Sequence, residues 1–483
     1  MRKRLLCLFL VGFCLLVGCQ PIPGGSLTSD YDLIGSVNST FFETESQDES
    51  LFEAESALLS SEATFSEDSS FFHSEPSVSG TVTSQISSAF SKPSTPSSMA
   101  QTSSFPSTTA KPSSTPAPSA VDYPSIKPIN GETKAVWISQ FDLQGVLKEN
   151  GNQRPKASFT TLFRQMLGKL KDYGFNTVFL QARPYSDSFY PSQYFPWSDM
   201  VVSAFGKEAE YDPYAVMVTE ARKYGFSVHG WINPLRGMTD QQLQLVDDRF
   251  PIKKWYNDPN KKGKNIVFKD NRWYYNSSVA EVRELIANGA KELLKSYQLD
   301  GIHIDDYFYY STSLEDVSKM VQGLYQAVKS VNPQAQFGVS PEGSIERDYS
   351  IHFADVRKWC SQKGYLDYIC PQIYYGLEHE THDFAKVVAD WNGLISKESG
   401  VYLLAGMTLG KAGNIDSFAG ERGKKEWQEH NDIIKRCIIE TRKQSNARGF
   451  SIFCYQYLFD PITGAKVERT AAEVANLLPE LKK

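Results

Sequence analysis

The sequence predicts a closed (β/α)8 barrel, and three observations support this fold class. An amphipathic helical stretch, a glycine-containing turn and a β-rich run recur along the chain from about Pro124 onward. Eight candidate strands alternate with these helices, which is typical of parallel βαβ units. No G-x-G-x-x-G motif follows the first strand, so a barrel is favoured over a doubly wound open sheet, which remains the alternative.

The repeating unit is clearest in residues 159–184. Leu162, Met166 and Leu170 recur there at helical spacing before Gly174 and a strand. The same order of helix, turn and strand returns in residues 214–234, 282–307 and 431–457. The eight predicted strands are, in chain order, KAVWISQ, NTVFLQAR, SVHGWINP, GIHIDDY, QFGVSPE, YICPQIY, VYLLAGM and GFSIFCY.

Residues 1–18 have the pattern of a secretory signal segment. Basic residues precede a short apolar run that ends in LVGC, and this run is too short to span a bilayer. The LVGC tetrapeptide resembles the lipobox of bacterial lipoproteins, which implies cleavage before Cys19 and attachment of diacylglycerol to its thiol. A plain signal peptide is the alternative. We therefore expect an exported protein that its N-terminal lipid holds on the extracytoplasmic side of the cell membrane.

Residues 19–122 are rich in Ser, Thr, Pro and acidic residues and show no apolar period, so we expect a disordered tether. Because the tether is acidic, the folded domain at 123–483 is close to neutral, which gives no electrostatic case for a nucleic-acid partner. The domain's four cysteines lack metal-site spacing, and two of them lie in strand-like runs, so buried free thiols are expected.

Active sites of such barrels lie where the carboxyl ends of the strands meet. Alternation along each strand predicts which side chains point inward there. The predicted inward set is mostly polar or aromatic and comes from different strands: Gln181, Arg183, His229, Trp231, Asn233, His303, Asp305, Ser340, Glu342, Gln372, Tyr374 and Tyr455. Polar groups at the top of a barrel need a ligand or each other as partners, so this set predicts a binding site.

Aromatic rings, amides, an arginine and carboxylates suit a sugar ligand. The loops after the second and fourth strands, RPYSDSFYPSQYFPWSD and DYFYYS, are aromatic too, and we expect them to offer platforms for sugar rings. They add Tyr185, Asp187 and Tyr307 to the substrate-binding candidates. Glycoside hydrolysis needs two carboxyl groups, for which the candidates are Asp305, Asp306 at the rim and Glu342, with Asp187 as a further one. If Asp305 is the acid, its partner is Glu342 or Asp306. No cofactor and no metal are predicted.

Several stretches resemble the glycosyl hydrolase-like 10 family, among them GFNTVFLQARPYSDSFYPSQYFPWS, DGIHIDDYFYY, FGVSPEG and DYICPQIYYG. The resemblance covers residues 130 to 460 and implies an exported barrel glycosidase whose substrate class is the glycan of peptidoglycan. It favours Asp305 with Asp306 over Glu342. The seventh strand, VYLLAGM, ends without a carboxylate, so the mechanism that uses glutamates after strands four and seven is not expected.

Two alternatives to a glycosidase remain. A metal-dependent hydrolase would use His229, His303 and Asp305 as ligands, but it would normally carry a His-x-His motif at the end of the first strand, where this chain has WISQ. A barrel that binds cell-wall glycan without cleaving it would use the same aromatic residues.

Overall fold

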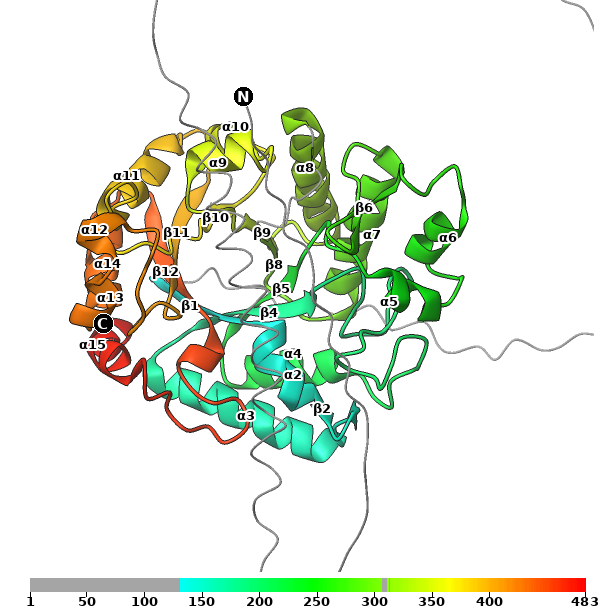
Figure 1. The fold of residues 1–483 in the computed structure, drawn as a ribbon, viewed down its shortest axis with the longest axis horizontal. Helices are drawn as coiled ribbons and strands as arrows, with labels where there is room; N and C mark the ends of the chain where they lie inside the picture. Colours follow the sequence, from blue (N-terminus) through cyan, green and yellow to red (C-terminus); the bar gives the residue numbers. More distant parts are fainter. Residues whose placement is uncertain (1–130, 306–310, 312) are drawn as a thin grey trace, which may run out of the picture. The chain divides into compact units, whose positions relative to one another are not determined.

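The computed structural model describes residues 131–305, 311 and 313–483, and its central feature is a closed parallel barrel (Figure 1). In this part of the chain the strands pair in the order β1-β12-β11-β10-β9-β8-β5-β4, and β4 closes the barrel on β1. The barrel strands are β1 (Thr133–Ile138), β4 (Thr177–Arg183), β5 (Ser227–Ile232), β8 (Gly301–Ile304), β9 (Gln336–Val339), β10 (Tyr368–Ile369), β11 (Tyr402–Thr408) and β12 (Ala447–Phe453). Each overlaps a strand expected from the sequence, so the predicted barrel is confirmed.

Several sequence predictions fall outside the described residues. These are the signal segment 1–18, lipidation at Cys19, the tether 19–122 and the sites Asp306 and Tyr307. Within the described ranges, no helix combines the length and the hydropathy that crossing a membrane requires. Cys360, Cys370 and Cys437 are buried free thiols, as is Cys454, which confirms the prediction for the cysteines.

Helices surround the barrel because each has one apolar side. Helix α8 buries Val317, Val321 and Leu324 at helical spacing, and it begins where Ser313 Oγ accepts the backbone N–H of Asp316. Helix α3 ends at Gly174, whose φ of 105° suits glycine. The longer outer helices are α3 (Lys156–Tyr173), α4 (Pro213–Lys223), α7 (Ala280–Ser296), α8 (Leu314–Val331), α11 (Phe384–Leu394), α14 (Ile433–Arg442) and α15 (Ala471–Leu481).

Shorter elements lie in the connections between strands and helices. The segment between β5 and α7 is the most elaborate: in Figure 1 its helices α5 (Asp240–Leu245) and α6 (Pro251–Asn257) lie to one side of the barrel. Its two-stranded sheet is β6 (Ile266–Lys269) with β7 (Arg272–Tyr275). The other short elements are α2 (Gln140–Leu147), β2 (Lys148–Glu149), β3 (Asn152–Gln153), α9 (Ile345–Ser350), α10 (Val356–Ser361), α12 (Gly420–Gly423), α13 (Glu426–Glu429) and the 3-10 turn η1 (Tyr455–Tyr457).

The barrel interior is filled largely by aromatic rings. Phe179 stacks on His303 with ring centroids 4.1 Å apart, and Trp137 packs against Phe179 at 5.4 Å. Tyr368 crosses the interior so closely over β9 that a Cβ at position 338 would lie 1.9 Å from its ring, which explains Gly338. The interior is therefore a packed layer, and the mouth above it is the part open to a ligand.

Candidate active site at the barrel mouth

Asp305 follows β8 directly, at the carboxyl end of the strand. Its side chain is 3% exposed, and Trp231 on the neighbouring β5 donates its indole N–H to Asp305 Oδ2 at 3.1 Å. This contact fixes the orientation of the carboxyl group at the end of the strand. A carboxyl group that is largely withdrawn from water and oriented by a neighbouring donor is suited to acid/base chemistry.

Two amide side chains link the ends of β1, β4 and β5. Gln181 Oε1 accepts the backbone N–H of Gln140 at 2.6 Å, and Gln181 Nε2 donates to Asn233 Oδ1 at 3.2 Å. Gln181 and Asn233 are each 1% exposed. The structure therefore brings both predicted residues together at one side of the mouth, where they hold the strand ends in place. Their contact with a substrate stays a prediction.

Glu342 lies beyond the end of β9 and is held by two basic side chains. Arg347 donates Nε–H to its Oε1 at 2.7 Å, and His352 Nε2 lies 2.8 Å from its Oε2. Burial alone would raise the pKa of this carboxyl, but the hydrogen bond from His352 and the charge of Arg347 outweigh burial and lower the pKa. Glu342 is therefore an ionised group with both oxygens engaged, which is unsuited to the role of a general acid.

Gln372 and Tyr374, two further predicted residues, follow the end of β10. Gln372 extends the barrel ladder through bridges to Glu342 and Gly406, and its side-chain amide donates to Ser340 O at 3.3 Å. The ring of Tyr374 lies 6.0 Å from that of Phe453. Gln372, Tyr374 and Phe453 are all partly exposed, so these residues reach solvent at the mouth.

His229 and His303 lie in the packed interior layer, 2% and 0% exposed. Trp137 can only donate, so its N–H bond to His303 Nε2 at 3.1 Å makes that nitrogen an acceptor. His303 Nδ1–H then donates to Tyr368 Oη at 3.0 Å, and Tyr368 donates to His229 Nδ1 at 2.9 Å. Burial lowers the pKa of His229 to about 4 and that of His303 well below its ordinary value. Both rings are neutral parts of a hydrogen-bonded chain, and their contact with a substrate stays a prediction.

Arg183 does not face the barrel axis, so its predicted orientation is wrong. The register of β4 against β5 shifts between Gln181 and Arg183, and this bulge turns the next side chain to the other face of the strand. The guanidinium of Arg183 lies 3.5 Å from the ring centroid of Phe195 and close to Gly289 of α7. Fully buried in the outer layer, Arg183 has no described hydrogen-bond partner, and burial lowers its pKa.

The long loop after β4 packs most of its aromatic residues inward. Phe189, Tyr190 and Phe195 are 0 to 1% exposed, so the prediction that they offer platforms to sugars is wrong. Asp187 is fully buried as well, accepts the backbone N–H of Tyr185 at 3.0 Å, and has its pKa raised to about 6 by burial. Of the two substrate-binding candidates in this loop, Tyr185 is partly exposed, whereas Asp187 is not.

Tyr455 does not line the mouth either, so its predicted inward position is wrong. Strand β12 ends at Phe453, and Tyr455 begins the turn η1, where strand alternation no longer applies. Its ring is fully buried and packs 5.8 Å from Phe459, which in turn lies 4.7 Å from Tyr173 of α3. Phe453, two residues earlier, points to the same side of β12 as Ser451 and lies at the mouth where Tyr455 was expected. The alternation of Ser451 and Phe453 along the strand could have indicated this position.

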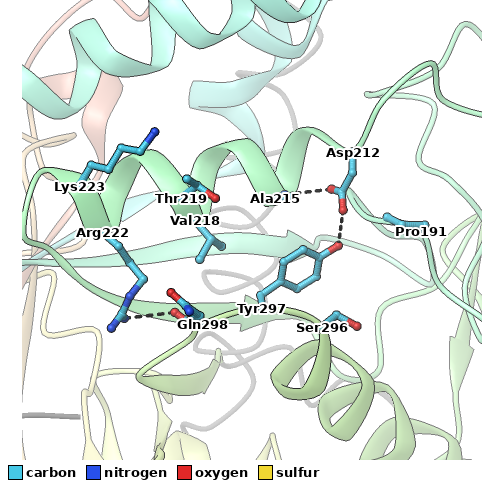
Figure 2. Close-up of a pocket in the computed structure, with 10 residues that line it drawn as sticks. All are labelled: Pro191, Asp212, Ala215, Val218, Thr219, Arg222, Lys223, Ser296, Tyr297 and Gln298. Carbon is cyan, nitrogen blue, oxygen red and sulfur yellow. Dashed lines mark hydrogen bonds between the residues drawn. The ribbon is translucent and has the colours of Figure 1, made fainter. Parts of the chain in front are cut away.

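Two grooves are lined by residues other than the predicted site residues. One, of about 630 Å³, runs between α4 and the end of α7 on the outer wall, as Figure 2 shows. Its carboxylate, Asp212, caps α4 through the N–H of Ala215 and accepts the hydroxyl of Tyr297 at 2.7 Å (Figure 2). A second groove, of about 400 Å³, lies beside the β4 loop and is lined by Trp197 and Phe250. Both oxygens of Asp212 are engaged by its two hydrogen bonds, and no other carboxylate of the described residues lines the first groove. The first groove therefore lacks the carboxyl pair of a glycosidase.

A metal site finds little support in this geometry. Among the residues that the structure describes, no group of three or more His, Cys, Asp or Glu side chains could hold a metal ion. Both ring nitrogens of His303 are engaged by Trp137 and Tyr368, whereas a histidine ligand must present one nitrogen to the metal.

Comparison with known proteins identifies the family. The chain is 29% identical over 329 residues to glycosyl hydrolase YngK of Bacillus subtilis (strain 168), which covers 59% of this chain and 62% of the relative. It is 28% identical over 291 residues to glycosyl hydrolase DigH of Escherichia coli (strain K12), which covers 51% and 65%. The chain thus spans less than two thirds of the length of these relatives.

One of the solved structures that align with this chain is the α-amylase of Geobacillus thermoleovorans complexed with acarbose. It covers 73% of this chain and 78% of its own, with a TM-score of 0.43 and 13% identity. The model of the glycosyl hydrolase-like 10 family matches residues 132–316 and 313–419, which is more than half of the chain. The chain belongs to the glycosyl hydrolase-like 10 family.

Proposed function

We propose that this protein is a cell-envelope glycoside hydrolase that cleaves the glycan strands of peptidoglycan at the mouth of the barrel. The observation that carries this proposal is Asp305, a carboxyl group at the end of β8 that is 3% exposed and oriented by the indole N–H of Trp231. Family membership and the names of the two relatives support a glycan-cleaving enzyme.

In the proposed reaction Asp305 is the general acid. It gives its proton to the glycosidic oxygen as the bond between that oxygen and the anomeric carbon breaks, and water supplies the hydroxyl group of the new reducing end. Asp306 is the proposed partner carboxylate. Glu342 is the weaker candidate because Arg347 and His352 occupy its two oxygens.

The substrate and location rest on the N-terminal sequence and the family resemblance. An exported chain with a lipid on Cys19 would be held at the membrane beside the cell wall, where peptidoglycan glycan is the abundant polymer. The partly exposed rings of Tyr374 and Phe453 at the mouth suit the apolar faces of sugars.

Digestion of purified wall material tests the proposal. The full chain, in mild detergent, is incubated with intact peptidoglycan and with glycan strands whose peptides an amidase has removed, and the products are analysed by mass spectrometry. We expect shorter strands with new reducing ends. Binding of the strands without any new reducing ends would instead support a non-catalytic glycan-binding protein and overturn the enzymatic proposal.

A further inference from the structure

A buried hydroxyl group without a partner lies beside Asp305. Ser340 directly follows β9 and is 1% exposed, and its Oγ has no hydrogen-bond partner among the described residues. Both of its backbone groups are engaged: its N–H donates to Ile304 O at 2.7 Å, and its carbonyl accepts the side-chain N–H of Gln372 at 3.3 Å. The hydroxyl is therefore the polar group of Ser340 that this part of the chain leaves unsatisfied.

The register of the barrel places this hydroxyl next to the carboxyl group of Asp305. Ile304 of β8 pairs with Val339 of β9, and the bond from Ser340 N–H to Ile304 O continues that ladder. Asp305 and Ser340 are therefore neighbours one step further along the two strands, where the Cα atoms of adjacent strands lie about 4.8 Å apart. Because a serine side chain has three staggered rotamers, its hydroxyl can turn to a carboxylate oxygen of this neighbour.

Both side chains point to the inside of the barrel. Trp231, which donates to Asp305, belongs to the packed interior layer. Gly338 faces the ring of Tyr368 in that layer, and Ser340 has the same direction two residues later because side chains alternate along a strand. The hydroxyl and the carboxyl group thus lie on the same face of neighbouring strands.

A general acid becomes an anion once it has given up its proton. A buried carboxylate needs hydrogen-bond donors, and Trp231 supplies one to Asp305 Oδ2 at 3.1 Å. An ionised carboxylate accepts about four hydrogen bonds, so a further donor can be accommodated. The unsatisfied hydroxyl of Ser340 offers that donor from the neighbouring strand. A donor placed where charge develops stabilises the transition state of the reaction.

We propose that Ser340 is a positioning residue for the acid: its hydroxyl turns to donate a hydrogen bond to the carboxylate that Asp305 becomes when its proton leaves. The proton of Asp305 goes to the glycosidic oxygen, and Ser340 keeps its own. The inference rests on the proposed function and adds to it a residue that makes Asp305 a more effective acid.

Titratable groups that face this pair from the same and neighbouring strands keep their charge near neutral pH. Burial lowers the pKa of His303 on β8 and of His229 on β5, and it raises the pKa of Tyr368 and of Cys370 beside the end of β10, so all four are uncharged there. Glu342, further along β9, is an anion already engaged by two basic side chains. A pH effect that differs between the wild type and a variant of the serine therefore reports on the acid.

Two serine variants test the proposal, because the barrel interior holds a second hydroxyl of the same kind. Ser451 on β12 is 0% exposed, and its Oγ also lacks a partner among the described residues. Its neighbours in the ladder are Ala135 and Gly406 instead of a carboxyl residue, so Ser451→Ala is the matched control for Ser340→Ala. The full-length wild type and both variants are assayed for kcat and KM on amidase-stripped glycan strands as a function of pH, and their thermal midpoints are measured.

We expect Ser340→Ala to lose about 10- to 150-fold in kcat, the range for one charge-assisted hydrogen bond, with KM nearly unchanged because the bond forms after binding. Without this donor the acid keeps its proton to higher pH, so the alkaline limb of kcat/KM should move upward. At the pH optimum the thermal midpoint should equal or exceed that of the wild type, because an unsatisfied buried hydroxyl is removed. Ser451→Ala should keep both kcat and the alkaline limb of the wild type.

Wild-type kcat in Ser340→Ala would overturn the proposal, as would equal losses of kcat in the two variants. A lower thermal midpoint with an unmoved alkaline limb would show a structural role and overturn it too. If the wild type cleaves no strand, the proposed function fails, and urea unfolding at several pH values still decides the hydrogen bond. Relative to the wild type, Ser340→Ala should then lose stability as pH rises and Asp305 ionises, whereas a difference that does not depend on pH would overturn the bond.

Discussion

The hydroxyl of Tyr368 joins two buried histidines, and we predict that Tyr368→Phe lowers the free energy of unfolding by about 2 to 6 kcal/mol. The oxygen lies 2.9 Å from His229 Nδ1 and 3.0 Å from His303 Nδ1, and the tyrosine is fully buried. Its removal leaves one ring N–H and one ring nitrogen without partners, and each unsatisfied buried group costs about 1 to 3 kcal/mol. The ring itself is kept, so packing adds little to the loss.

Urea unfolding followed by tryptophan fluorescence measures this change as a lower midpoint with an unchanged slope. Tyr402→Phe is the matched control, because Tyr402 on the neighbouring β11 lies 5.7 Å from Tyr368 and is partly exposed. We expect it to cost less than about 1 kcal/mol. If Tyr368→Phe unfolds at the midpoint of the wild type, the proposed chain of hydrogen bonds through the interior is refuted.

Three further predictions concern the core, pH and the catalytic pair. Gly338→Ala should unfold at a lower temperature than the wild type because its Cβ would lie 1.9 Å from a buried ring, whereas Gly323→Ala, with open space around it, should be neutral or stabilising. Because burial lowers the pKa of His229 to about 4, the unfolded chain binds the extra proton first, so stability should fall as pH decreases from about 6.5 to 4. Urea titrations at several pH values should show that this loss of stability is smaller in His229→Gln. If the stability of His229→Gln falls with pH as steeply as that of the wild type, the lowered pKa of His229 is contradicted. Glu342→Gln should retain more glycan-cleaving activity than Asp306→Asn, and the reverse order would make Glu342 the partner carboxylate.

The regular strands made much of the barrel predictable from the sequence. Alternation correctly placed His229, Trp231 and His303 in the interior, because β5 and β8 keep their register across these positions. It failed for Arg183, where a bulge in β4 reverses the direction of the side chain, and for Tyr455, which lies past the end of its strand. A bulge and a strand end are set by contacts with neighbouring segments, which the alternation of a single strand does not contain.

The surroundings of the predicted residues were harder to predict. The partners of Glu342 come from a short helix and the turn after it, and their charges decide its role more than its position after the strand does. Arg236 and Arg272 lie 4.3 Å and 4.5 Å from the ring centroid of Tyr185, and these three residues come from two loops and a hairpin that are distant in sequence. Contacts of this kind depend on how the loops fold back on the barrel, and local sequence patterns do not encode that.

The most direct test of the catalytic role of Asp305 is to measure kcat of the variants Asp305→Asn and Asp300→Asn. The substrate is glycan strands from which the peptides have been removed. Asp300 lies at the other end of β8, where it accepts the N–H of Val228 at 2.8 Å and pairs with Arg222 at 2.9 Å. We expect Asp305→Asn to lose about 100- to 10,000-fold in kcat with a near wild-type thermal midpoint, whereas Asp300→Asn should lose stability and keep kcat. Wild-type turnover by Asp305→Asn would contradict the account.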